Sequence, residues 1–111
     1  MKDPADIYRS LVTAGDQMAD DAYNYRILED STKSILAQLT IEARAVAGSQ
    51  AEALSIALCD STYRDHLKAC AEASRISERS KIRYFAARTY SDHIRTAEAS
   101  HRAAMTSGIA T

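Results

Sequence analysis

The chain has 111 residues, a formal net charge of −1 and 26% charged residues. This length allows one ordinary domain, and a chain so near neutrality has no overall field that would draw it to nucleic acid or to an anionic membrane. The sequence has no apolar run of the roughly eighteen residues that a membrane-spanning helix needs, so we expect no membrane association.

Alanine dominates the apolar composition. The chain has 21 alanines but only 19 residues of Leu, Ile, Val and Phe combined, with three Gly and one Pro. Alanine is the strongest helix former, whereas compact β architectures need many more turn residues. The composition predicts an all-α protein with a thin hydrophobic core. Because the N-terminus is too polar for a secretory signal, we expect a cytoplasmic protein in which Cys59 and Cys70 are reduced.

The first predicted helix spans about residues 4–47. Asp3 can cap its N-terminus and Pro4 suits the first helical position, and no strong helix breaker follows until Gly48. Apolar or small residues recur every seven positions, as in a coiled coil; they are Leu11, Met18, Tyr25, Thr32, Leu39 and Val46. The repeat predicts one long helix with an apolar stripe.

Two further helices are predicted. Ser49 and Glu52 form a capping-box pattern that begins a short corner helix over about 50–59, for which Leu54, Ile56, Ala57 and Leu58 supply an apolar face. Asp60 or Ser61 can cap a third helix over about 61–105, a stretch without Gly or Pro. Its middle, residues 74–81, has few large apolar side chains, so it is either a close contact between helices or a weakly packed region.

The charges of the two long segments are opposite. Residues 3–47 contain eight acids and four bases, whereas residues 61–105 contain nine bases and five acids. Opposite charges favour the pairing of two helices and set their register more than they stabilise them. We therefore predict a single helical domain over 1–111, an antiparallel, coiled-coil-like hairpin of two long helices joined by the corner helix.

The apolar stripes are wider than one helix–helix seam. A two-helix hairpin leaves about half of each helix in water, so we expect self-association into a dimer or tetramer, the simplest form being a helical bundle. A monomer whose corner helix packs back remains the alternative, and its uncovered stripes would then dock an unknown protein partner. The residues expected at the oligomer interface are Leu28, Ile35, Leu39, Ile76, Tyr84, Phe85 and Tyr90.

No pattern for catalysis or for a cofactor emerges. Glu98 and His101 form a Glu-x-x-His pair, but a di-iron bundle needs two such pairs and two more carboxylates. None of the three histidines has another histidine four residues away, so the sequence lacks that zinc signature. We expect no enzyme, no catalytic or cofactor-binding residues, and no metal.

One segment suggests a different function. Residues 75–88 carry five bases and one acid beside Tyr84 and Phe85, and basic side chains with stacking rings suit single-stranded nucleic acid. The acidic first helix would lie alongside, so the segment is either neutralised by it or exposed. The nucleic-acid-binding residues in this alternative are Arg75, Arg79, Lys81, Arg83 and Arg88.

Several segments resemble a loosely defined set of small helical phage and prophage proteins, which are often encoded near single-strand annealing recombinases. The similar segments are 25–29 (Tyr-Arg-Ile-Leu-Glu) with Lys33 and 35–37, then 49–53, 63–67 (Tyr-Arg-Asp-His-Leu) and 95–99. The resemblance implies a helical hairpin in a bacterial host cytoplasm and assigns no residue a role. We expect a non-enzymatic helical interaction or assembly protein; the alternative is an accessory single-stranded nucleic-acid-binding protein in phage recombination.

Overall fold

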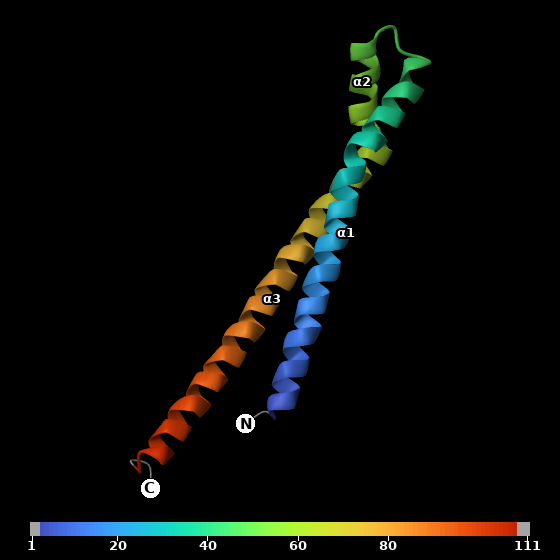
Figure 1. Ribbon diagram of the computed structural model, residues 1–111. Helices are drawn as coiled ribbons and strands as arrows, with labels where there is room; N and C mark the ends of the chain where they lie inside the picture. The colour runs from blue at the N-terminus through green and yellow to red at the C-terminus, as the bar shows by residue number, and fades with distance from the viewer. Residues whose placement is uncertain (1–2, 109–111) are drawn as a thin grey trace. The chain divides into compact units, whose positions relative to one another are not determined.

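A computed structural model describes residues 3–108 of the protein, which form three α-helices (Figure 1). In chain order, α1 spans Pro4–Arg44, α2 spans Gln50–Cys59 and α3 spans Ser61–Thr106. α1 and α3 pack antiparallel and α2 connects them, which confirms the predicted all-α helical hairpin. The short helix has its predicted bounds, whereas α1 ends three residues earlier than expected and α3 one residue later.

Each helix begins at a side-chain cap. The Asp3 carboxylate accepts the Ala5 N–H at 3.0 Å, and the Asp60 carboxylate accepts the Thr62 N–H at 2.7 Å. At α2, Ser49 Oγ accepts the N–H of Glu52 at 3.2 Å. These oxygens satisfy N–H groups that have no partner within a helix, so the predicted start signals are confirmed.

The end of α1 differs from the prediction. The N–H groups of Val46 and Ala47 both donate to the carbonyl of Ala43, at 3.1 and 3.0 Å, which closes the chain into a turn. Arg44 Nη1 donates to the Ala47 carbonyl at 2.8 Å and fixes that turn. Val46, expected in the apolar stripe, is therefore outside the helix and 81% exposed.

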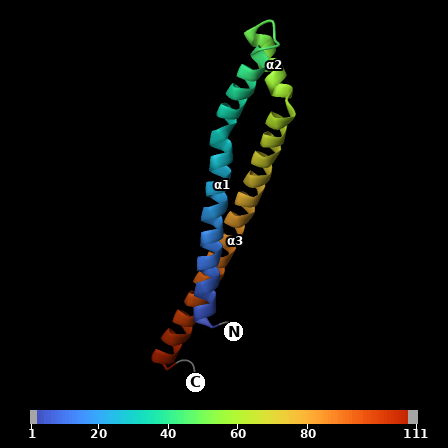
Figure 2. The same cartoon turned by 90° about the vertical axis from the view of Figure 1, so that its right-hand side faces the viewer.

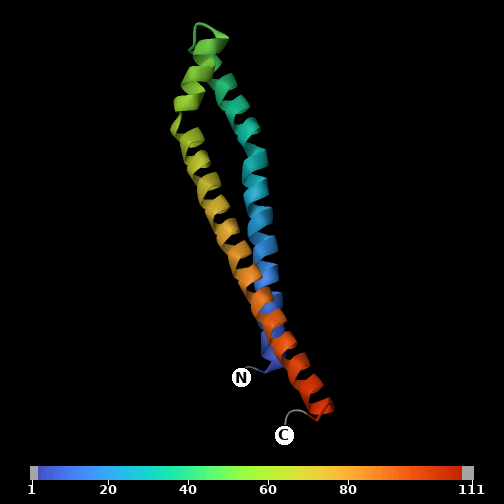
Figure 3. The same cartoon turned by 90° about the vertical axis from the view of Figure 1, so that its left-hand side faces the viewer.

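The chain forms two compact units, which we describe separately. Of the described residues, unit 1 comprises 3–19 and 79–108, and unit 2 comprises Asp20–Glu78. In unit 1, the start of α1 runs antiparallel to the C-terminal half of α3, whose last turns extend beyond the start of α1 (Figure 2). In unit 2, the rest of α1 lies opposite the start of α3, with α2 at the connection (Figure 3).

The inward positions of both helices follow the alternating four- and three-residue spacing of a coiled coil. On α1 the buried or half-buried positions in this spacing are Ile7, Leu11, Ala14 and Met18 in unit 1, and Asp21, Tyr25, Leu28, Thr32, Ile35 and Leu39 in unit 2. On α3 they are Tyr63, His66, Cys70, Ala73 and Ser77 in unit 2, and Ser80, Tyr84, Ala87, Ser91, Ile94 and Glu98 in unit 1. We call these two rows the seam.

The core is thin, as the composition predicts. Within residues 3–108 no large side chain is fully buried, and the most buried apolar residues are Ala53 and Ala57 of α2, at 0 and 1% exposure. Leu54, Ile56 and Leu58, expected as the packing face of α2, are 40–44% exposed. Small methyl side chains therefore face inward at the connection, while the larger ones face solvent. None of the described helices is both long and apolar enough to cross a membrane.

Candidate interaction surface

The α3 side of the seam is made mostly of small or polar side chains. Ser77 in unit 2 and Ser80 in unit 1 are only 3 and 2% exposed, so the segment 74–81 places small residues against α1 rather than forming a weakly packed region. Three large apolar side chains of α3, Tyr63, Tyr84 and Ile94, lie in the seam. Six others lie outside it and are 41–68% exposed; they are Leu67, Ile76, Ile82, Phe85, Tyr90 and Met105. The hairpin therefore uses the less apolar side of α3 for its own packing.

The residues predicted at the oligomer interface divide into two groups. Four are half-buried in the seam within one chain, and three are exposed. The seam residues are Leu28, Ile35, Leu39 and Tyr84; the exposed ones are Ile76, Phe85 and Tyr90. Only the second group, at 41–55% exposure, leaves a large share of each residue available to a partner.

One flank of unit 2 carries exposed isoleucines from both long helices. Helical periodicity places Ile27 and Ile41 of α1 on the same flank as Ile76 of α3, and these three are 46, 74 and 41% exposed. A groove lined by Gln38 and Glu42 of α1 and by Thr62 of α3 lies on this side. We call the flank the isoleucine face; its other members are Asn24, Ser31 and Ala69.

The five bases proposed for nucleic acid do not share one side of α3. In unit 1, Arg79 and Arg83 are four residues apart and lie together, whereas Lys81 and Arg88, seven residues apart, lie on the nearly opposite side. In unit 2, Arg75 Nε donates to the Glu72 carboxylate at 3.0 Å. Nucleic-acid binding through these residues remains a prediction. The five bases do not form one continuous surface on which a nucleic-acid strand could lie.

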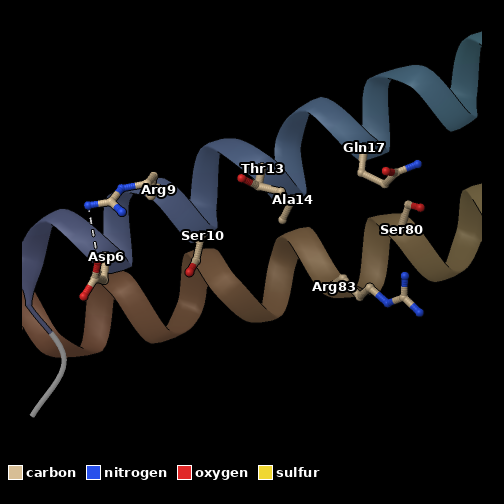
Figure 4. A pocket seen from close by; sticks show the side chains of 8 residues that line it. All are labelled: Asp6, Arg9, Ser10, Thr13, Ala14, Gln17, Ser80 and Arg83. Atoms are coloured by element: carbon tan, nitrogen blue, oxygen red, sulfur yellow. Dashed lines mark ion pairs between the residues drawn. The ribbon is translucent and has the colours of Figure 1, made fainter.

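A groove in unit 1 runs between α1 and α3 (Figure 4). Arg9 on its rim forms an ion pair with Asp6 at 3.3 Å, and Arg83 of α3 lines the groove nearer to Ser80, away from this pair. The other lining side chains are Ser10, Thr13, Ala14, Gln17 and Ser80. The groove therefore offers hydroxyl, amide and charged groups for polar contacts.

Polar side chains also meet across the seam of unit 2. Thr32 Oγ1 lies 2.9 Å from His66 Nε2 and 3.9 Å from Cys70 Sγ, and the thiol sulfur lies 3.4 Å from His66 Nε2. We call these three residues the polar layer. Next to it, a hydrogen bond with Glu29 raises the pKa of Tyr25 above its usual value.

No motif in the sequence predicted the polar layer. The zinc signature that the histidines lack is a pair of histidines four residues apart, whereas the pair here is a histidine and a cysteine at that spacing. The signal His-x-x-x-Cys at residues 66–70 is visible in the sequence, but the approach of Thr32 from α1 depends on how the two helices pair.

The Glu98–His101 pair has a half-buried glutamate and an exposed histidine, beside a recess that Ile94, Ala97 and Arg102 also line.

Comparisons of this chain with protein-family models, with curated proteins and with solved structures found no match.

Proposed function

We propose that the protein is a non-enzymatic helical assembly protein in which a second copy of the chain covers the apolar side chains that the hairpin leaves exposed. The observation that carries this proposal is which residues of α3 face α1 in the seam. Serine, alanine and other small or polar residues fill most of the inward positions, while Ile76, Phe85 and Tyr90 remain outside. Removing these outward side chains from water would supply the driving force for association.

The charges of the helices favour a second copy over an unrelated partner. α1 contains seven acids and four bases, whereas α3 contains five acids and nine bases. α1 of one copy therefore attracts α3 of another, and such complementarity favours an antiparallel pairing of hairpins and disfavours like-to-like contacts. The isoleucine face of unit 2 offers three exposed isoleucines from both long helices, and burying these apolar side chains desolvates no charge of their own.

The test is the solution mass, measured by light scattering after size exclusion, for the wild type and two matched variants. Ile76 and Leu67 are 41 and 43% exposed on opposite flanks of α3. We expect a dimer or tetramer for the wild type, a monomer for Ile76→Lys, and an unchanged oligomer for Leu67→Lys.

Circular dichroism of the same samples checks that both variants remain helical. A wild type that is monomeric at every concentration would overturn the proposed assembly. An oligomer that Leu67→Lys disrupts and Ile76→Lys leaves intact would overturn the isoleucine face as its contact.

A further inference from the structure

We propose that the polar layer of unit 2 binds a borderline-soft divalent cation of the zinc class, with the Cys70 thiolate and His66 Nε2 as its two strong ligands. Both residues lie on α3 four positions apart, and this spacing places two side chains on the same side of a helix. Each is half-buried at the seam. The helix thus holds a sulfur and a nitrogen donor close together before any ion is present.

The distance between the two donors fits a single tetrahedral ion. Zinc binds cysteine sulfur at about 2.3 Å and histidine nitrogen at about 2.0–2.1 Å, which places the two ligand atoms about 3.5 Å apart at a tetrahedral angle. Cys70 Sγ and His66 Nε2 are 3.4 Å apart. An ion can therefore contact both atoms without a change of helix geometry.

Thr32 supplies a third, weaker donor from the opposite helix. Its Oγ1 lies 2.9 Å from His66 Nε2 and 3.9 Å from Cys70 Sγ, so the three atoms outline one face of a coordination tetrahedron. Thiolate and imidazole ligands favour zinc and related transition metals over magnesium and calcium. The donor set therefore defines the class of ion.

The number of strong ligands sets the strength of binding. Among residues 3–108 no group of three or more His, Cys, Asp and Glu side chains could hold a metal ion. Two strong ligands, the Thr32 hydroxyl and water predict weak, exchangeable binding rather than a closed structural site.

The decisive measurement is a titration of the reduced protein with Co²⁺, which acts as a spectroscopic substitute for zinc. We expect a sulfur-to-cobalt charge-transfer band that Zn²⁺ displaces. Cys70→Ser should abolish the band. His66→Ala should weaken cobalt binding at least about tenfold, since loss of even a second-shell partner commonly costs that much.

Cys59 provides the matched control. It is an exposed cysteine of α2, and positions 55 and 63, four residues to either side, carry serine and tyrosine rather than histidine. Cys59→Ser should therefore keep the full cobalt band. Absence of the band in the wild type, or its persistence in Cys70→Ser, would overturn the site and leave the three side chains as a hydrogen-bonded contact between helices.

A second measurement uses the unaltered sequence, so it does not depend on the folding of a variant. Zn²⁺ should slow alkylation of Cys70 by iodoacetamide while alkylation of Cys59 proceeds at its original rate, as resolved by mass spectrometry of the digested protein. Equal rates for Cys70 with and without zinc would contradict the proposal. The oligomeric state of the protein does not enter this test.

Discussion

Gly15 of α1 faces the Tyr84 ring of α3 in unit 1. It lies in the interior of α1, where glycine costs about 1 kcal/mol relative to alanine because the unfolded chain loses more backbone freedom. A Cβ built on Gly15 would lie 3.4 Å from Cε2 and 3.6 Å from Cδ2 of the Tyr84 ring. These are ordinary packing distances, so one methyl group fits there without displacing the ring.

We expect Gly15→Ala to stabilise the protein by about 0.5–1 kcal/mol, the gain in helix propensity. Urea unfolding followed by circular dichroism measures this change as a higher midpoint at constant slope. Gly15→Val is the control, because its branched side chain would press on the Tyr84 ring and offset the gain. An alanine variant less stable than the wild type would show that the ring tolerates no additional atom.

At the scale of the elements, the small seam residues of α3 set how closely the helices approach. Ser77 is 3% exposed, and one turn before it Ser74 hydrogen-bonds the large seam residue Tyr25 of α1. Large side chains on one helix pack best against small ones on the other, because well-packed interiors leave few voids. The serines therefore act through their size as well as their polarity.

We expect Ser77→Leu to destabilise the protein by about 1–3 kcal/mol, the usual range for overpacking a filled interface. Ser77→Ala should remain within about 1 kcal/mol of the wild type, because it keeps the size and gains helix propensity while losing a hydroxyl. Thermal and urea unfolding of both variants provide the measurement. Equal stability of the leucine variant and the wild type would contradict a close helix contact at this position.

At the scale of the whole molecule, seam residues and outward residues should respond differently to protein concentration. Leu39 is half-buried in the seam of unit 2, whereas Phe85 of α3 is 55% exposed. A contact within one chain contributes the same stability at any concentration. A contact between copies contributes more as concentration rises, because association stabilises the folded state by mass action.

We therefore expect the melting temperature of the wild type to rise with protein concentration. Leu39→Ala should lower it at every concentration, by the equivalent of about 2 kcal/mol, the lower end of the range for large-to-small substitutions. Phe85→Ala should have little effect in dilute samples and should reduce the concentration dependence. Calorimetry over a dilution series provides the measurement, and equal losses from Phe85→Ala at all concentrations would place that ring within one folded chain.

The sequence by itself determined the helices, their caps and their order. Alanine-rich composition, the seven-residue repeat of α1 and the capping residues Asp3, Ser49 and Asp60 are local signals, and the structure confirms the elements they predict. The end of α1 at Arg44 was missed because the turn that follows depends on backbone and side-chain hydrogen bonds rather than on a breaking residue.

Only the tertiary structure decided which side of α3 faces α1. Ile76 and Tyr90, which the sequence predicted at an oligomer interface, are exposed, as is Leu67, while Ser77 and Ser80 face inward. The physical reason is that a seam depends on the fit between two surfaces, and the larger side chains of α1 require small partners across from them. The same pairing brought Thr32 to His66 and Cys70, a juxtaposition that no spacing within either helix could predict.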